Sequence, residues 1–173
     1  MKTNISRPIK IGKETFQTLH YNADEFVMNY KLQKGGMVPP HVHIHMDEQF
    51  ILLKGEMKFK VDGKTIYKKA GEEIMVPKGI EHSISNAGTE EVEMTVKYLP
   101  CADVHRFFEI ITTFDELNPG SMSSLFKAFY IGERIGLKDF STPKSAVVTG
   151  IIKGIVTITG KVSGWDKLIP QFK

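Results

Sequence analysis

GGMVPPHVHIHMDEQFILLKG, residues 35–55, places three histidines at alternate positions and follows them with two adjacent carboxylates. Side chains two positions apart on a strand project from the same face, so His41 and His43 reach one point inside a sheet or barrel. Glu48 has the opposite parity and shares that face only if a turn or bulge intervenes around residues 44–47. Two imidazoles and one carboxylate that converge from neighbouring strands suit a divalent transition metal. The stretch therefore predicts a candidate metal site that joins two strands.

The segments on either side of this stretch alternate between apolar and polar residues, as antiparallel strands with one buried face do. The alternation is clearest in EFVMNYKL (25–32), EMKFKVDG (56–63) and EEVEMTVKYLP (90–100). Asp62-Gly63 tolerates the positive φ angles of a tight turn, which predicts a hairpin into the next strand. Many short strands with no helical pattern between them indicate a sandwich or a barrel. Most of the inward apolar residues are expected to fill its core, and lining a pocket above the metal is the alternative.

The last third of the chain has helical spacing instead. Asp103 is a candidate cap for a first helix, and Ser121 is a candidate cap for a second. Thr142 is a candidate N-cap with Pro143 at the first helical position, and the pair would open a third segment, AVVTGIIKGIVTITGKV (146–162). The β-branched residues of that segment favour a strand, but its start signal leads us to expect a helix.

GEEIMVPKGIEHSISN, residues 71–86, supplies a further histidine, His82, just after a turn marked by proline and glycine. Alternation alone does not show which strand lies beside it. Together, however, the two stretches resemble the two motifs of the cupin superfamily. The first motif is glycine, five residues, His-X-His, three or four residues, glutamate, six residues and glycine. The second is glycine, five residues, Pro-X-Gly, two residues, histidine, three residues and asparagine. The chain fills every position, with Gly35, His41, His43, Glu48, Gly55, Gly71, Pro77, Gly79, His82 and Asn86.

The resemblance implies a mainly β fold, a double-stranded β-helix or jelly-roll cupin barrel, with a metal in its mouth. Its implied ligands are His41, His43, Glu48 and His82. We therefore expect a cupin barrel domain over residues 1–100 and a C-terminal helical extension over residues 101–173.

Three neutral nitrogens and one anionic oxygen suit several divalent transition metals, so the geometry matters more than the affinity. A tetrahedral arrangement would give a closed zinc site. An octahedral arrangement would leave two adjacent positions for water, dioxygen or a substrate. The resemblance favours the octahedral form, so iron, manganese or nickel is expected ahead of zinc. Glu48 is the candidate catalytic base.

Our leading hypothesis is a metal-dependent enzyme of the dioxygenase type that acts on a small organic molecule. A metal-assisted isomerase or lyase is the enzymatic alternative. A non-catalytic module that binds or senses a small ligand is the alternative from another class, because one fold hosts many functions.

The remaining features restrict the partners and the compartment. The chain has 173 residues, 41% of them hydrophobic and 25% charged, with a net charge of +3 and no cluster of basic residues, which argues against nucleic acid. Its one cysteine, Cys101, forms no internal disulfide, and the N-terminus lacks an apolar signal core, so we expect a cytoplasmic protein.

Residues 146–160 contain Gly150 and Gly154 at a spacing used by membrane helices. That stretch is short and interrupted by a lysine, so we expect a buried or interface helix, and we expect a homodimer from the resemblance. His45 is expected to face solvent.

Overall fold

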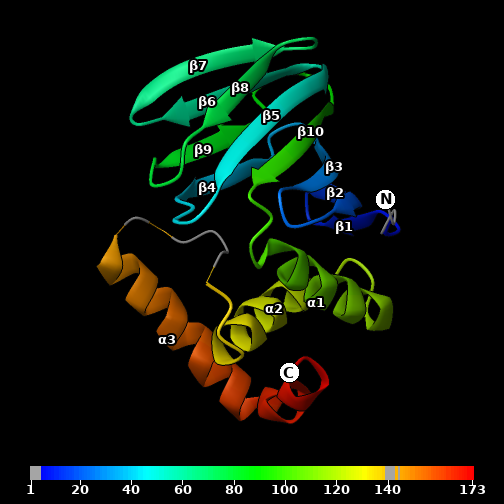
Figure 1. Cartoon of the computed structure of the whole chain (residues 1–173), viewed down its shortest axis with the longest axis vertical. Helices are drawn as coiled ribbons and strands as arrows, with labels where there is room; N and C mark the ends of the chain where they lie inside the picture. Colours follow the sequence, from blue (N-terminus) through cyan, green and yellow to red (C-terminus); the bar gives the residue numbers. More distant parts are fainter. Residues whose placement is uncertain (1–4, 139–142, 144) are drawn as a thin grey trace.

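The computed structural model describes residues 5–138, 143 and 145–173 (Figure 1). Within these residues the chain forms ten β-strands, then three α-helices and a C-terminal 3-10 helix. The strands are β1 (Ile9–Ile11), β2 (Glu14–Tyr21), β3 (Phe26–Leu32), β4 (Met37–His41), β5 (Asp47–Lys54), β6 (Glu56–Val61), β7 (Lys64–Lys69), β8 (Glu73–Val76), β9 (His82–Ser85) and β10 (Val92–Leu99). The helices are α1 (Val104–Leu117), α2 (Met122–Arg134), α3 (Ala146–Val162) and η1 (Trp165–Gln171).

The strands form two antiparallel sheets that face each other as a jelly-roll barrel. The six-stranded sheet has the order β1-β2-β3-β10-β5-β8, and the four-stranded sheet has the order β4-β9-β6-β7. The helices gather at one end of the barrel, beyond the end at which β10 leaves it (Figure 1). The mainly β fold with helices after it is the fold that the sequence predicts.

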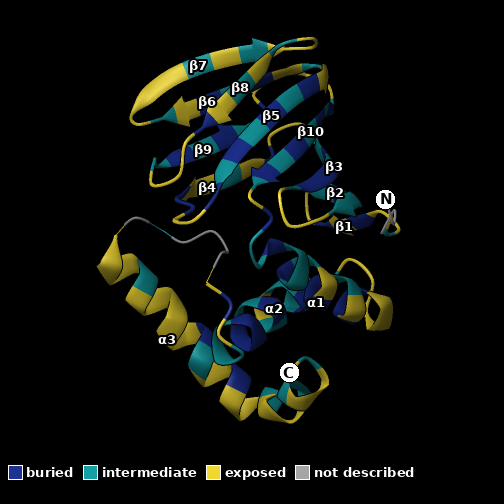
Figure 2. Cartoon of the chain, in the orientation of Figure 1, coloured by how far each residue is buried: buried dark blue, intermediate teal, exposed yellow. Residues whose placement is uncertain are grey.

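The alternation in the sequence becomes the division between the core and the surface. On β10, which lies between β3 and β5, the residues Val92, Met94, Val96 and Tyr98 are all at most 7% exposed. The residues between them are only partly buried, as Figure 2 shows for the strands of both sheets. Asp62-Gly63 has positive φ angles of 47° and 77° in the turn between β6 and β7, which confirms the predicted hairpin. On β10, the period-2 pattern thus reports which face of the strand is buried.

Helix α1 packs directly on the barrel. The ring of Phe108 lies 5.2 Å from that of Phe16 and 5.1 Å from that of Phe26, measured between centroids. Phe16 and Phe26 are strand residues that are 8% and 1% exposed. The aromatic cluster therefore completes the barrel core with a side chain from the helical part.

A partly buried ion pair also joins the N-terminal segment to α1. Arg7 Nη2 donates to Asp115 Oδ2 of α1 at 2.7 Å, and the backbone N–H of Gly120 donates to Asp115 Oδ1 at 2.7 Å. The side chain of Asp115 is 2% exposed, whereas that of Arg7 is 43% exposed. Cys101, at the junction of strands and helices, is buried.

The three helices start near the expected positions, but not with all the expected caps. Asp103 precedes α1 without a side-chain capping bond, whereas the Ser121 hydroxyl accepts from a backbone N–H at the start of α2. The helix over 146–162 is confirmed, but its cap is Ser145. Pro143 therefore lies before the cap, and the prediction of proline at the first helical position is wrong. Thr142 lies outside the described residues.

No helix among the described residues is long and apolar enough to cross a membrane by itself. α3 and η1 meet that test only as a pair, and they are bent by 93° at the break between them.

Candidate metal centre

The four predicted ligands come from two strand pairs and one turn. His41 ends β4 and lies opposite His82, the first residue of β9, in the antiparallel register. Glu48 lies near the start of β5, which pairs with β10 on one side and β8 on the other. His43 lies in the connection between β4 and β5, past the end of the strand. The expected turn around residues 44–47 is therefore present, and it brings Glu48 back to the side of the histidines.

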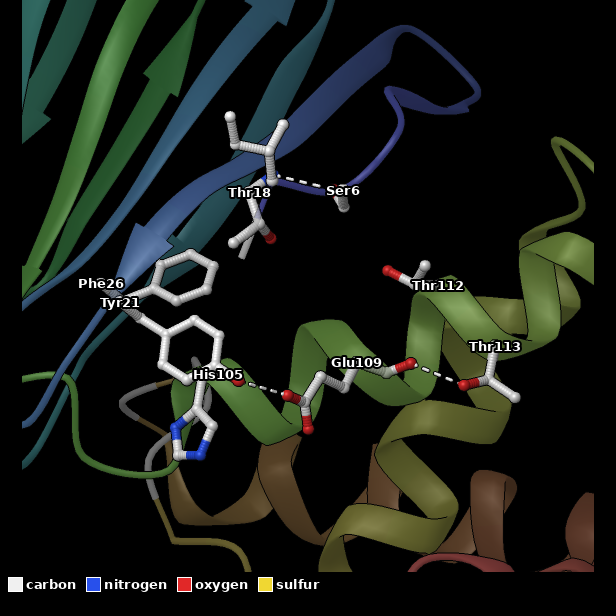
Figure 3. Close-up of a pocket in the computed structure, with 9 residues that line it drawn as sticks. Ser6, Thr18, Tyr21, Phe26, His105, Glu109, Thr112 and Thr113 are labelled. Atoms are coloured by element: carbon white, nitrogen blue, oxygen red, sulfur yellow. Dashed lines mark hydrogen bonds between the residues drawn. The ribbon is translucent and has the colours of Figure 1, made fainter. Parts of the chain in front are cut away.

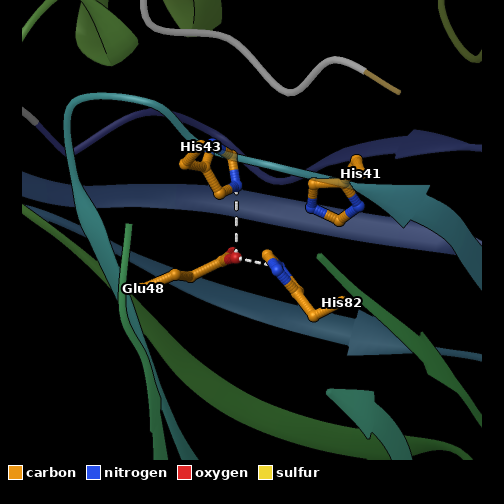
Figure 4. A group of neighbouring side chains, drawn as sticks. All are labelled: His41, His43, Glu48 and His82. Atoms are coloured by element: carbon orange, nitrogen blue, oxygen red, sulfur yellow. Dashed lines mark hydrogen bonds and ion pairs between the residues drawn. The ribbon is translucent and has the colours of Figure 1, made fainter. Parts of the chain in front are cut away.

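The four side chains converge at one point (Figure 4). His41, His43, Glu48 and His82 are buried, and each offers one ligand atom within 4.8 Å of the others. Glu48 Oε2 lies 2.7 Å from His82 Nε2 and 3.2 Å from His43 Nε2. The centroids of the His41 and His82 rings are 4.2 Å apart. His45, in contrast, is exposed and stands outside this group, as predicted.

Two of the histidines are oriented by backbone carbonyls. His41 Nδ1 lies 2.8 Å from the carbonyl oxygen of Pro39, and His82 Nδ1 lies 3.2 Å from that of Ile80. A carbonyl only accepts, so both Nδ1 atoms carry the proton and both Nε2 atoms turn toward the cluster. Partners of this kind commonly fix the tautomer of a metal-binding histidine.

His43 has no such partner among the described residues. Its ring is 5% exposed, yet neither nitrogen forms a hydrogen bond of good geometry there, although Nε2 lies close to Glu48. A polar group buried without a partner costs free energy, and such groups in native proteins often mark an ion or a functional site. The donor set, the burial and a ring without a well-formed hydrogen bond among the described residues fit a divalent transition metal.

Burial and mutual contact shift the pKa values of these groups in different directions. Burial lowers the pKa of His41 to about 4, so this ring is neutral at pH 7. Burial raises the pKa of Glu48, but the nearby His43 and His82 outweigh that effect and hold the pKa well below its usual range. Burial lowers the pKa of His82, and its bond to Glu48 more than reverses this, so the pKa lies above its usual value. In the metal-free cluster, the negative charge of Glu48 and the protonated form of His82 therefore stabilise each other.

The turns that carry the two motifs are tied to each other. The backbone N–H of Gly79 donates to the carbonyl of His43 at 2.7 Å, and the backbone N–H of Lys78 donates to Asp47 Oδ1 at 2.8 Å. These bonds fix the position of His43 relative to His82, because His82 follows Gly79 by three residues. Asp47, directly before Glu48, therefore helps to hold the turn of the second motif against that of the first.

Aromatic rings enclose the cluster. The ring of Tyr98 lies 5.3 Å from that of His43, and the ring of Phe50 lies 6.2 Å from that of His82. Tyr98 also faces Glu48 across the β10–β5 pair, and burial and the Glu48 charge raise its pKa well above the usual value. These inward residues form the wall of the site as well as part of the core.

A separate pocket of about 390 Å³ lies where β2 meets α1 (Figure 3). The hydroxyl of Tyr21 donates to Glu109 Oε1 across it at 2.7 Å, and the Tyr21 ring stacks on His105. None of the four cluster residues lines this pocket, so it is not part of the candidate metal centre.

Comparisons with known proteins agree with this architecture. Residues 28–98 match the model of the Cupin domain family. Oxalate oxidase 2 of Hordeum vulgare is 35% identical over 72 residues, which cover 37% of this chain and 32% of that protein. Germin-like protein 3-5 of Oryza sativa subsp. japonica is 36% identical over 72 residues, with the same coverage. The chain thus spans about a third of the length of these curated relatives.

Solved structures extend the similarity to most of the barrel. KdgF from Halomonas sp. superposes with a TM-score of 0.54 at 14% identity, over 58% of this chain and 91% of that one. A predicted oxalate decarboxylase from Thermotoga maritima superposes with a TM-score of 0.50 at 25% identity, over 57% and 94%. Residues 28–98, which match the family model, contain both motifs and the four converging side chains. In sequence and in fold, residues 28–98 of this chain are a cupin domain.

Proposed function

We propose that His41, His43, Glu48 and His82 bind a divalent transition metal, and that the protein is a metal-dependent cupin enzyme acting on a small organic molecule. The observation that carries this proposal is the convergence of four buried ligand atoms around His43, whose ring nitrogens form no hydrogen bond among the described residues. Packing alone gives no reason to bury an imidazole in that way. We favour iron, manganese or nickel, with zinc as the alternative.

The proposed reaction is an oxygen-dependent oxidation or cleavage. A bound ion would supply Lewis-acid and redox chemistry. His41 and His82 present fixed Nε2 atoms because their Nδ1 protons are held by backbone carbonyls. The low pKa of Glu48 makes it an anionic ligand first, and we assign it the second role of accepting a proton from the substrate. Tyr98 and Phe50 would exclude water from the reacting groups.

Metal content tests the binding site directly. The protein as isolated should contain about one equivalent of a transition metal by elemental analysis, since the four residues form one site. His41→Ala and His82→Ala should lose most of it, whereas His45→Ala, an exposed histidine of the same run, should retain it. Equal metal content in all four proteins would contradict the proposed ligands.

Oxygen uptake tests the reaction. Oxalate is the first substrate to try, because oxalate oxidases are among the relatives of the matched region, and small diols and thiols follow. The loaded protein should consume oxygen with one of these, and Glu48→Gln should lose turnover. Turnover of a substrate without oxygen uptake would instead favour a metal-assisted isomerase or lyase. Binding without turnover in either protein would favour a sensing module.

We further propose that the protein works in the cytoplasm as a homodimer, with a small molecule rather than nucleic acid or a membrane as its partner. The single cysteine is buried, which suits a reducing compartment. Fractionation of cells that express the full chain tests the compartment, and retention in the soluble cytoplasmic fraction is the expected result.

A further inference from the structure

Helix α3 carries a continuous row of exposed apolar side chains, which we name the α3 stripe. Seven Val and Ile residues form it, and each is between 44% and 85% exposed. They are Val147, Val148, Ile151, Ile152, Ile155, Ile158 and Val162. Five of them, from Val148 to Val162, follow the alternating intervals of three and four residues that mark the contact seam of a coiled coil.

The opposite face of α3 fixes how the helix is turned. Val156 and Gly160 are the buried residues of this helix. A Cβ atom on Gly160 would lie 2.1 Å from the ring of Tyr130 in α2, so the two helices are in close contact there. Lys153 adds an ion pair of 2.7 Å with Glu133. The α3 stripe therefore faces away from α2, and Figure 2 shows most of α3 as exposed.

The exposed area is large for a surface that stays in water. Together the seven side chains expose about as much as four fully solvated Val or Ile residues, which is on the order of 600 Å². The largest apolar patch of an ordinary monomer covers about 300–600 Å² and is often functional. A standard interface buries about 800 Å² on each partner. The α3 stripe alone therefore approaches the size of one half of such an interface.

We propose that two copies of this chain associate through the α3 stripe, so that the stripe of one copy covers the stripe of the other. A twofold interface uses the same patch on both partners, and the alternating three-and-four spacing suits the packing of one helix against another. A lipid surface is the other candidate for an apolar helix face. However, the stripe contains only Val and Ile, and Trp165 packs on Tyr130 at 5.7 Å between ring centroids instead of flanking it. Interfacial helices usually present aromatic side chains to the lipid.

Light scattering on the full chain, over a dilution series in the micromolar range, tests this inference. The wild-type mass should be twice 19.5 kDa. Ile151→Glu and Ile155→Glu should each reduce it to 19.5 kDa. Ala146→Glu is the matched control, because Ala146 is exposed and lies nine residues, about two and a half turns, before Ile155, on the opposite side of α3. This variant should remain a dimer.

A cross-link gives a second, independent readout if a charged variant does not fold. A twofold axis through the middle of the stripe brings Ile155 next to its copy, so Ile155→Cys in a Cys101→Ala background should form a disulfide-linked dimer on mild oxidation. Ala146→Cys in the same background should not. A monomeric wild-type chain would overturn the inference, and its binding to phospholipid vesicles would identify a lipid surface as the occupant. A dimer that survives both charged variants would also overturn it.

Discussion

Replacing His82 with alanine, in protein freed of metal by a chelator, tests the buried charge pair of the cluster. His82 Nε2 lies 2.7 Å from Glu48 Oε2, and the two side chains are 1% and 5% exposed. The substitution leaves a buried carboxylate whose contact with His43, at 3.2 Å, remains. Breaking a buried pair by removing one partner costs about 3–5 kcal/mol. We expect the lower end of that range because His43 stays.

The assay is a double-mutant cycle of the free energy of unfolding in urea, with thermal melting beside it. His82→Ala should lower Tm by on the order of 10 °C in a chain of this size. The double variant with Glu48→Gln leaves no buried charge unpaired, so it should be more stable than the two single effects predict by about 2 kcal/mol. His45→Ala, at an exposed position, should stay within about 0.5 kcal/mol of the wild type. Single effects that simply add would refute the charge pair.

Three further predictions concern the fold. Burial raises the pKa of Glu14, so the folded protein loses stability as the pH rises through that pKa. Glu14→Gln should therefore increase Tm at pH 7 and leave it unchanged below pH ~4, and an equal effect at both pH values would contradict this. Asp115→Ala should cost about 2–3 kcal/mol in urea unfolding, because it removes two hydrogen bonds to a buried charge, one of them from Arg7. A loss below about 0.5 kcal/mol would count against the pair. Gly160→Ala should lower Tm by overpacking against α2, although alanine favours a helix. Gly154→Ala, with open space around its added Cβ, should raise Tm instead. The reverse order would mean that α3 does not dock as described.

The sequence predicts those parts of the site that depend on local geometry. The spacing of His41 and His43 correctly predicts that they reach one point, although His43 lies past the end of β4. The need for a turn before Glu48 follows from parity alone. The opposition of His41 and His82 in β4 and β9 does not follow from alternation. Strand order is set by crossovers between distant segments, so only the resemblance suggested that neighbourhood.

The start of α3 shows a different limit. Thr142-Pro143 and Ser145 lie within four consecutive positions, and each fits the residue preferences of a helix start. Local preference therefore finds the helix but not its first residue. The structure caps it with Ser145, whose hydroxyl accepts from the N–H of Val148. Tertiary contacts of the helix, such as that of Gly160 with α2, decide its register.

The ring of Phe108 against Phe16 and Phe26 has a practical consequence for work on this protein. A chain shortened to its strands would present those two rings to water and would tend to aggregate. KdgF and the Thermotoga maritima protein align over 91% and 94% of their own length but over only 58% and 57% of this chain, so a shortened version invites comparison with them. If the shortened chain were insoluble, the cause would be the loss of the Phe108 ring that covers Phe16 and Phe26, and the result would say nothing about the metal site. Every measurement should therefore use the chain with its helices.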